Sequence, residues 1–327
     1  MEKNEKTKKK NKIRALVLVS GGLDSALAIK ILNEQEIETT AIVFKSFFFN
    51  EKRAESVAKE LNVNFKIVDF SEEHLAMVKN PKHGYGKAMN PCIDCRLLML
   101  KKAKEIMDRE GFDFVATGDV LGQRPMSQNI ASLNLIEKEA GLAGYLLRPL
   151  SAKVLEKTIV EEKGLIDREK LLGISGRSRN VQLALAKKWN IKNYSSPAGG
   201  CLLTDKEFGK RLEELVEKEP GCDGNDVELL KLGRHLFQNK IKIIIGRDQE
   251  ENRKMGKLAQ KGDIVLEMEN YTGPLALVRN YGEEEEGGLE KAIGKAKELV
   301  QFYSTRARAK TDVKFKKTCL RRRHLSV

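Results

Sequence analysis

The feature that most constrains this chain is a glycine turn placed between a buried strand and a helix. Residues 15–19 form an apolar, partly β-branched run whose length suits a fully buried strand. Residues 26–32 read as a helix that packs on a sheet. The turn between them has the sequence SGGLDS, residues 20–25. Because a strand end, a glycine turn and a helix N-terminus gather backbone N–H groups around one concavity, the sequence predicts an anion site here.

Each residue type in this turn suits the binding of a phosphate. Gly21 and Gly22 let the main chain approach a phosphate without a Cβ in the way. Ser20 and Ser25 can donate hydroxyl protons, and Asp24 can order the loop or hold a metal ion on the phosphates. The Walker sequence G-x-x-x-x-G-K-[ST] and the dinucleotide sequence G-x-G-x-x-G are both absent from the chain. The turn therefore predicts a phosphate site of another kind.

Strands and helices are expected to alternate through the first part of the chain. Further strands are predicted at residues 39–44, 64–70 and 112–116, with helices at 51–61 and 97–109 between them. Such alternation with short links implies a parallel sheet covered on both faces. Ligands of such a sheet bind at the carboxyl ends of its strands, where the SGGLDS turn lies. The expected fold class is α/β, a doubly wound parallel sheet, followed by a smaller α+β domain.

The sequence also predicts where the chain divides. The stretch PGCDG, residues 220–224, interrupts the helical pattern and is the candidate linker. We expect four segments, which are a basic tail at 1–14, an ATP-binding domain at 15–219, a smaller α+β domain at 220–304 and a second basic tail at 305–327.

The net charge of +13 is concentrated in those two tails. Residues 1–14 carry +5 and residues 305–327 carry +8, so the rest of the chain is formally neutral. Such tails favour a polyanion, although a solvated tail that only aids solubility is an alternative. No apolar run approaches the ~18 residues of a membrane span, and the first residues lack the apolar segment of a secretory signal. We therefore expect a cytoplasmic protein without a membrane partner.

Three of the five cysteines lie in turns rich in proline or glycine. Cys92 and Cys95 form a C-x-x-C at the start of a helix, where the helix N-terminus and Arg96 are expected to stabilise thiolates. Cys201 ends the turn SPAGGC. Three kinds of site are consistent with this pattern. They are a redox dithiol of Cys92 and Cys95, a structural zinc site that recruits Cys222, or a three-cysteine iron–sulfur cluster with one iron open to a substrate sulfur.

Several of these stretches resemble known enzyme families. The turn resembles the SGGxDS signature of the PP-loop ATP pyrophosphatases, which split ATP into AMP and pyrophosphate and use the adenylyl group to activate an oxygen. The sequence NPCIDC at 90–95, with ATGD at 116–119, is similar to the corresponding stretch of tRNA 2-thiouridylases. Asp119 stands where that family has histidine, so no histidine role is carried over. Further stretches resemble a ThiI-like thiolase family, namely RPL at 148–150, GRSR at 176–179 and PAGGCLLTD at 197–205.

This resemblance covers about residues 15–205 and implies an ATP-dependent tRNA thiolase. A uridine carbonyl oxygen would be adenylated and then replaced by sulfur held at Cys92, Cys95 and Cys201. In related thiolases such cysteines hold a [4Fe-4S] cluster, which we expect here, with zinc or a catalytic persulfide as alternatives. ATP and Mg²⁺ are the other cofactors implied, and tRNA and a sulfur donor (sulfide or a carrier protein) are the partners. Asp24 and the three cysteines are the candidate catalytic residues. The candidate ATP-binding residues are Ser20, Gly21, Gly22, Asp24, Ser25, Val43, Phe44, Thr117 and Gly118, of which Val43 and Phe44 are expected by analogy to hold adenine.

The C-terminal domain carries a second resemblance. Residues 244–252 (IIGRDQEEN), with GDI at 262–264 and GPL at 273–275, resemble the NFACT-R (DUF814) module, which is associated with RNA and is found joined to ThiI-like PP-loop domains. Two other functions are consistent with parts of the sequence. One is a PP-loop synthetase that forms an amide on a small acid, and the other is an RNA-binding factor without catalysis.

Overall fold

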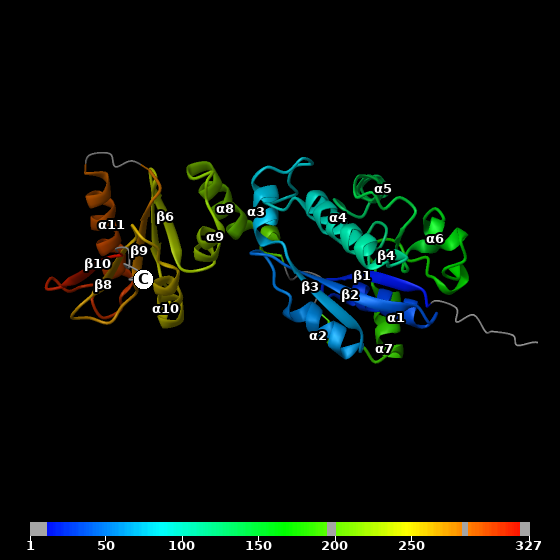
Figure 1. Ribbon diagram of the computed structural model, residues 1–327. Coiled ribbons are helices and arrows are strands. Elements are labelled where there is room, and N and C mark those ends of the chain that lie inside the picture. Colours follow the sequence, from blue (N-terminus) through cyan, green and yellow to red (C-terminus); the bar gives the residue numbers. More distant parts are fainter. Residues whose placement is uncertain (1–11, 195–200, 283–286, 321–327) are drawn as a thin grey trace, which may run out of the picture. The chain divides into compact units, whose positions relative to one another are not determined.

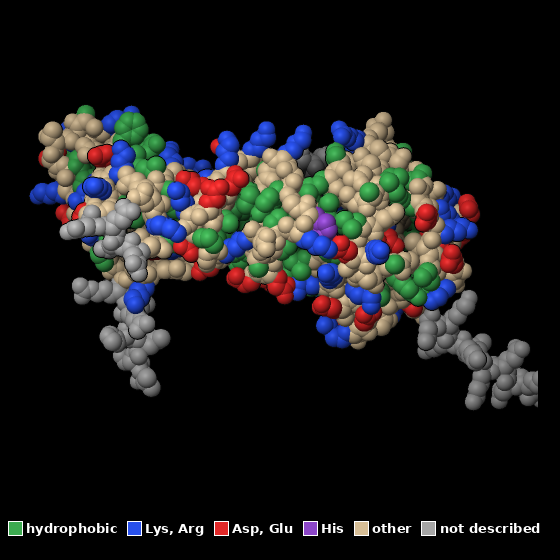
Figure 2. All heavy atoms as spheres, turned by 90° about the horizontal axis from the view of Figure 1, so that it is seen from above, with side chains coloured by type: hydrophobic (Ala, Val, Ile, Leu, Met, Phe, Trp, Pro, Cys, Tyr) green, Lys and Arg blue, Asp and Glu red, His purple; other side chains and the backbone are tan. Residues whose placement is uncertain are grey.

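The computed structural model describes residues 12–194, 201–282 and 287–320 (Figure 1). The chain forms two compact units, of which the first runs to Leu202 and the second begins at Leu203. On the face drawn in Figure 2, Lys and Arg side chains are interspersed with Asp and Glu over both units. This mixture agrees with the near-neutral charge of the chain between its two basic ends.

The first unit is built on a five-stranded parallel sheet in the order β3-β2-β1-β4-β5. Its strands are β1 (Arg14–Val19), β2 (Glu38–Lys45), β3 (Asn64–Asp69), β4 (Phe114–Thr117) and β5 (Leu146–Leu147). The chain adds β2 and β3 on one side of β1 and then crosses to add β4 on the other. The strand order therefore reverses between β1 and β4, and such a reversal opens a crevice for ligands at the carboxyl ends of the strands.

Both faces of this sheet are covered by helices. Along β1, Ala15, Val17 and Val19 enter one core, whereas Leu16 and Leu18 enter the core on the opposite face. The first core is closed by α1 (Leu23–Asn33), α2 (Lys52–Glu60) and α7 (Asn180–Lys188), and the second by α4 (Cys92–Glu110) and α5 (Ile130–Glu139), with α3 (Ser71–Lys79) packed on α4 (Figure 1). The doubly wound α/β fold expected from the sequence is thus confirmed. The remaining short elements are α6 (Ile159–Glu162) and the 3-10 turns at Ala152–Val154, Arg168–Lys170 and Leu202–Thr204.

The second unit contains an antiparallel sheet in the order β10-β8-β9-β7-β6. Strand β7 (Ile241–Ile245), between β9 and β6, sends Ile241, Ile243 and Ile245 toward α11 (Gly288–Tyr303), while Ile244 packs on the other face with Met255. The remaining elements are α8 (Lys206–Lys218), α9 (Gly224–Leu230), β6 (Arg234–Gln238), α10 (Gln249–Leu258), β8 (Ile264–Met268), β9 (Ala276–Asn280) and β10 (Phe315–Cys319). The smaller α+β domain is therefore present.

The limits of the second unit differ from those expected from the sequence. Residues 203–219, expected in the first domain, belong to the second unit because α8 buries Phe208, Leu212 and Leu215 and packs on α9. Residues 315–319, expected in a basic tail, form β10 and pair with β8. Backbone pairing explains the second difference, since an edge strand can keep Lys316 and Lys317 exposed while its peptide groups complete the sheet.

Within the described ranges, no helix is both long and apolar enough to cross a membrane.

Candidate functional site

The SGGLDS turn, residues 20–25, has glycines where other residues do not fit. Gly21 has a φ of +75°, and a Cβ built on it lies 2.8 Å from the backbone nitrogen of Ala54. Gly22 is the N-cap of α1 and keeps an extended backbone. The hydroxyl of Ser25 donates to the carbonyl oxygen of Gly22 at 2.9 Å, so it braces the turn, whereas Ser20 is exposed. The turn thus presents the first N–H groups of α1 at the carboxyl edge of β1, as an anion site requires.

Gly118 brings the end of β4 against the SGGLDS turn. A Cβ on Gly118 would lie 2.5 Å from the carbonyl carbon of Asp24 and from the backbone nitrogen of Ser25. Only glycine permits this approach. Thr117 is buried, and its hydroxyl donates to Oδ2 of Asp119 at 2.9 Å. Both predicted residues of β4, Thr117 and Gly118, therefore lie at the crevice between β1 and β4.

Asp24 belongs to a polar cluster that is not fully hydrogen-bonded. Gln123 Nε2 donates to its Oδ2 at 2.8 Å. The guanidinium of Arg179 lies 3.6 Å from its Oδ1, which is buried and has no hydrogen-bond partner in the described part of the chain. Because Mg²⁺ prefers carboxylate oxygens as protein ligands, this unpartnered Oδ1 fits a magnesium ion on bound phosphates.

Sequence reasoning missed Gln123 and Arg179 as partners of Asp24. Gln123 lies in the loop that follows β4, and Arg179 ends the loop that precedes α7. The signal was present in the fold, because loops at the carboxyl ends of parallel strands converge on one edge of the sheet. Each of these loops also contains a glycine with positive φ, Gly122 and Gly176.

Val43 and Phe44, which were predicted to hold adenine, lie near the carboxyl end of β2. Val43 pairs with Val19 on one side and Ile67 on the other. The ring of Phe44 packs edge-on against Phe70, with the ring centroids 5.1 Å apart. Both predicted side chains are buried, and their role toward adenine stays a prediction.

Cys92 and Cys95 lie in the first turn of α4, which begins at Cys92. The side-chain amide of Asn90 donates to Sγ of Cys92 at 3.2 Å. The backbone nitrogen of Ala88 donates to Oδ1 of Asn90 at 3.1 Å and so fixes the amide. Gly86 leaves room for this arrangement, since a Cβ there would lie 2.4 Å from Asn90 Nδ2. The asparagine of NPCIDC therefore supplies a donor directed at one sulfur.

Cys201 comes close enough to this pair to influence its ionisation. Burial raises the pKa of the Cys95 thiol, and the Cys201 and Cys92 thiols raise it further, against an opposing effect of Arg96. The sequence predicted stabilised thiolates, and for Cys95 that prediction is wrong. The reason is that burial and the two neighbouring thiols outweigh the guanidinium. All three cysteines keep part of their surface exposed.

The segment that carries Cys201 is anchored to the loop after β2. The backbone nitrogen of Leu202 donates to the carbonyl oxygen of Phe48 at 3.0 Å. The residues before Cys201 in its turn, 195–200, lie outside the described residues. Cys222, considered as a fourth zinc ligand, is buried in the second unit. In the described ranges, no three or more His, Cys, Asp or Glu side chains are positioned to hold a metal ion.

Arg96 joins the cysteine helix to the end of β4. Its guanidinium lies 2.5 Å from Oδ1 of Asp119, and Gln128 Nε2 donates to the same oxygen at 2.8 Å. Burial opposes the ionisation of Asp119, but the guanidiniums of Arg96 and Arg148 outweigh it and lower the pKa of this carboxyl. The aspartate that stands in place of the family histidine is therefore an ionised anchor for the residue next to Cys95.

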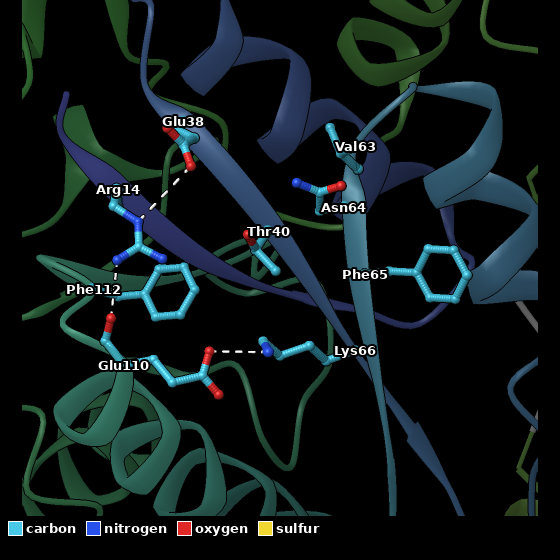
Figure 3. Close-up of a pocket in the computed structure, with 9 residues that line it drawn as sticks. All are labelled: Arg14, Glu38, Thr40, Val63, Asn64, Phe65, Lys66, Glu110 and Phe112. Carbon is cyan, nitrogen blue, oxygen red and sulfur yellow. Dashed lines mark hydrogen bonds and ion pairs between the residues drawn. The ribbon is translucent and has the colours of Figure 1, made fainter.

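An open hollow of about 510 Å³ lies elsewhere on the first unit (Figure 3). Its lining includes Arg14, Glu38 and Asn64, the first residues of β1, β2 and β3. Its charged side chains are already paired, as in the contact of 2.9 Å between Lys66 and Glu110. Because the hollow is at the amino ends of the strands, it is opposite the edge that carries the SGGLDS turn.

Two family models match the chain. Residues 13–188, more than half of the chain, match the family described as the tRNA methyl transferase HUP domain. Residues 233–327 match the family described as the NFACT protein RNA binding domain.

Two relatives that are 30% or more identical each match less than half of the chain. A probable tRNA sulfurtransferase of Finegoldia magna is 30% identical over 46% of this chain and 38% of its own length. A tRNA-specific 2-thiouridylase MnmA of Helicobacter hepaticus is 32% identical over 32% of this chain and 34% of its own length. The chain thus spans little more than a third of these two relatives. A solved structure, a predicted subunit of tRNA methyltransferase from Methanocaldococcus jannaschii, covers 54% of this chain and 76% of its own with 16% identity and a TM-score of 0.36.

Proposed function

We propose, from the premise that this chain belongs to the tRNA methyl transferase HUP domain family, that it is an ATP-dependent tRNA sulfurtransferase. In this proposal the enzyme adenylates a uridine carbonyl oxygen and replaces that oxygen with sulfur held at Cys92, Cys95 and Cys201. The relatives named as a tRNA sulfurtransferase and a tRNA 2-thiouridylase support the reaction class.

The observation that carries the proposal is a short path of contacts from the cysteines to the SGGLDS turn. Arg96, adjacent to Cys95, pairs with Asp119. Asp119 follows Gly118, which packs against the backbone of Asp24. An activated oxygen and the sulfur that displaces it must meet at one carbon atom. A sulfurtransferase therefore needs its ATP site and its sulfur site to be neighbours, and this path supports that arrangement.

The ATP step follows from the chemistry of the leaving group. A carbonyl oxygen of uridine is a poor leaving group, whereas AMP is a good one. The oxygen attacks the α-phosphorus of ATP, the bond to the β-phosphate breaks, and pyrophosphate departs with its charge. The N–H groups at the start of α1 are positioned to stabilise that charge. Magnesium bound at Asp24 Oδ1 would neutralise part of the polyphosphate charge.

The sulfur step requires a carrier, and we propose a [4Fe-4S] cluster held by Cys92, Cys95 and Cys201. Their chemistry supports it, because cysteine thiolates are the ligands that hold iron–sulfur clusters, and Cys92 and Cys201 lie close enough to Cys95 to influence its pKa. A cluster distributes its ligands over separate irons, so it does not need three side chains around one ion. When bound, the cluster supplies an iron that can carry sulfide. Zinc and a persulfide are the alternatives to the cluster, and the experiment below separates them from it.

Recognition of the nucleic acid is assigned to the second unit and the basic ends. The match of residues 233–327 to an RNA binding domain supports tRNA as the partner. Binding through phosphate contacts should weaken steeply as salt is raised. Either sulfide or a carrier protein would supply the sulfur.

The decisive experiment measures the two half-reactions separately. Exchange of labelled pyrophosphate into ATP should depend on unmodified tRNA, and sulfur should enter that tRNA after anaerobic reconstitution with iron and sulfide. Cys92→Ser, Cys95→Ser and Cys201→Ser should each keep the exchange and lose sulfur transfer. Cys319→Ser, which changes an exposed cysteine on β10, is the matched control and should keep both the exchange and the sulfur transfer.

The other outcomes identify the alternatives. Sulfur transfer by a protein that shows no iron absorption would indicate a zinc site or a persulfide in place of the proposed cluster. Exchange that depends on a small carboxylic acid and not on tRNA would favour an amide-forming synthetase. Binding of RNA with no AMP ever produced would favour a factor without catalysis.

A further inference from the structure

Three buried polar atoms without hydrogen-bond partners lie in one cluster at the carboxyl edge of the first sheet. They are Oδ1 of Asp24, Nε of Arg179 and Oε1 of Gln182, each unpartnered in the part of the chain that the structure describes. Gln123 joins two of these residues, because it donates to Asp24 at 2.8 Å and accepts from Gln182 Nε2 at 3.2 Å, and Arg179 lies 3.6 Å from Asp24. Gln182 is 0% exposed. Because a buried polar atom without a partner costs stability, three in one cluster indicate a place where a ligand completes the hydrogen bonding.

The two loops that carry this cluster are fastened to each other. Leu121 forms a parallel bridge with Ser175, and the backbone nitrogen of Gly176 donates to the carbonyl oxygen of Leu121 at 2.7 Å. Gly176 has a φ of +82° and Gly122 a φ of +77°, conformations that favour glycine. The loop after β4 and the loop before α7 thus lie side by side, and each brings one side chain to Asp24, Gln123 from the first and Arg179 from the second.

Arg179 is a cationic residue in the second of these two loops. Its guanidinium lies 3.6 Å from Asp24 Oδ1, too far for a hydrogen bond, and its side chain is 15% exposed. It is also the N-cap residue of α7, so the positive end of that helix lies beside it. A planar guanidinium with free N–H groups matches the paired oxygens of a phosphate.

We propose that Arg179, held beside Asp24 at the start of α7, binds the pyrophosphate portion of ATP and holds it as it leaves. This inference rests on the ATP-cleaving function proposed above and adds a residue to it. The backbone N–H groups of the SGGLDS turn bind the polyphosphate from one side, and Arg179 binds it from the other. Among the residues that the structure describes, Asp24 is the only carboxylate that forms an ion pair with Arg179. The arrival of magnesium at Asp24 and of phosphate at Arg179 therefore satisfies both.

The test compares two probes on the full-length protein, inorganic pyrophosphate with Mg²⁺ and AMP, by calorimetric titration. Arg179→Ala should weaken pyrophosphate binding tenfold to a hundredfold, roughly the effect of losing charge-assisted hydrogen bonds. AMP binding should stay within about twofold of wild type, because AMP lacks the phosphates that Arg179 contacts. Arg179→Lys should bind pyrophosphate more tightly than Arg179→Ala but less tightly than wild type. Lysine keeps the positive charge but lacks the paired N–H donors of the guanidinium. Arg177→Ala, an exposed arginine in the same loop, is the matched control and should change neither affinity.

The outcomes separate this inference from the proposed function. A wild-type protein that binds neither probe, and shows no ATP cleavage, contradicts the ATP site itself. A wild-type protein that binds both probes, with Arg179→Ala binding pyrophosphate equally well, overturns the role of Arg179 alone. An equal loss of pyrophosphate and AMP in Arg179→Ala also overturns it, because it shows that the arginine only supports the shape of the site. Arg179→Lys keeps the test valid if the alanine variant unfolds.

Discussion

Each unit of this protein contains a cluster of buried polar side chains, and the two clusters differ in how far their hydrogen bonds are satisfied. At the carboxyl edge of the parallel sheet, atoms of Asp24, Arg179 and Gln182 are buried without partners. In the second unit Arg279 is just as deeply buried, yet its guanidinium is paired with Asp226 and Asp263. Buried polar groups with partners hold a structure together, whereas unsatisfied ones mark a site that awaits a ligand.

The satisfied network in the second unit joins three elements. Arg279 on β9 binds both carboxylate oxygens of Asp263, at 2.9 and 2.7 Å, and donates to Asp226 near the start of α9 at 2.6 Å. The hydroxyl of Tyr281 donates to the same oxygen of Asp226 at 2.7 Å. Burial and Asp226 raise the pKa of Tyr281 well above its usual value, against an opposing effect of Arg279. This network therefore fastens α9 to the sheet and requires no ligand.

The largest stability effect should come from breaking that network. Arg279→Met leaves Asp226 and Asp263 charged and unpaired, so it should lower the free energy of unfolding of the second unit by about 3 to 5 kcal/mol. The single tryptophan, Trp189, lies in the first unit. Denaturation followed by circular dichroism should therefore shift, while the Trp189 fluorescence transition should not.

A surface pair provides the control for this prediction. Arg247→Met breaks an ion pair with Glu251 on the same unit, where the arginine side chain is 48% exposed, and should cost well under about 1 kcal/mol. If Arg279→Met proves as mild as Arg247→Met, the distinction between a structural network and an open site loses its basis.

The next largest effect concerns activity. Asp24→Asn removes the carboxylate that we propose binds magnesium, so ATP cleavage should fall about 100-fold or more, measured as the rate of AMP formation. Thermal stability should stay the same or rise, because an unsatisfied buried oxygen is replaced by an amide. A variant that loses stability and activity in parallel would place Asp24 among structural residues.

Lys242 sharpens the comparison, because it is a buried polar group of the second unit that lacks a hydrogen-bond partner within the described residues. Burial lowers the pKa of its ammonium to about 8 from 10.5, while Asp226 opposes that shift. The unfolded chain therefore binds more protons than the folded chain between pH 8 and 10.5, and the contribution of Lys242 to stability rises with pH across that window.

Replacing this lysine by Met should accordingly stabilise the second unit. The gain should be about 3 kcal/mol at pH 7 and vanish above pH 10.5. The difference in unfolding free energy between wild type and Lys242→Met, measured at several pH values, isolates this group from others that titrate. A difference that is the same at pH 7 and pH 11 would show that the ammonium is not destabilised by its burial.

The smallest effect should come from an exposed ion pair of the first unit. Lys45 lies 2.7 Å from Asp69, and both side chains are about half exposed. Hydrogen bonds from Lys45 and Ser71 lower the pKa of Asp69 to about 2 from 3.8, so the pair stabilises the fold above pH 4 and loses its effect as the pH falls toward 2. Lys45→Ala should cost less than about 0.5 kcal/mol at pH 7 in a denaturant titration. A cost as large as that of Arg279→Met would contradict this ranking.

The parts of the fold that follow from local pattern could be predicted from the sequence. The apolar run before Gly21 and the alternation of strands and helices were sufficient for the parallel sheet and for the place of the SGGLDS turn. The boundary between the two units was not predictable from the proline and glycine residues of the stretch at 220–224 alone. The amphipathic pattern of α8 suits packing on either unit. Strand β10 was missed because Lys316 and Lys317 make an edge strand resemble a charged tail.

The site could be predicted only in part, for a related reason. Asp24, Gly118 and the cysteines belong to short motifs whose residue types indicate their chemistry. Arg179 contacts Asp24, and Gln182 contacts Gln123, across long separations in the sequence, and nothing in their local sequence predicts these contacts. The ionisation of Cys95 likewise depends on Cys201, which is distant in sequence. Such convergence is a property of the folded chain.

The central claim is that one oxygen of tRNA is both activated by ATP and replaced by sulfur. The most direct test uses tRNA whose uridine carbonyl carries oxygen-18, incubated with ATP, the reconstituted protein and sulfide, followed by mass spectrometry of the released AMP and of the tRNA nucleosides. The account predicts one labelled oxygen in AMP for each sulfur that enters the tRNA. Thiolated tRNA accompanied only by unlabelled AMP, or labelled tRNA recovered without sulfur, would contradict it.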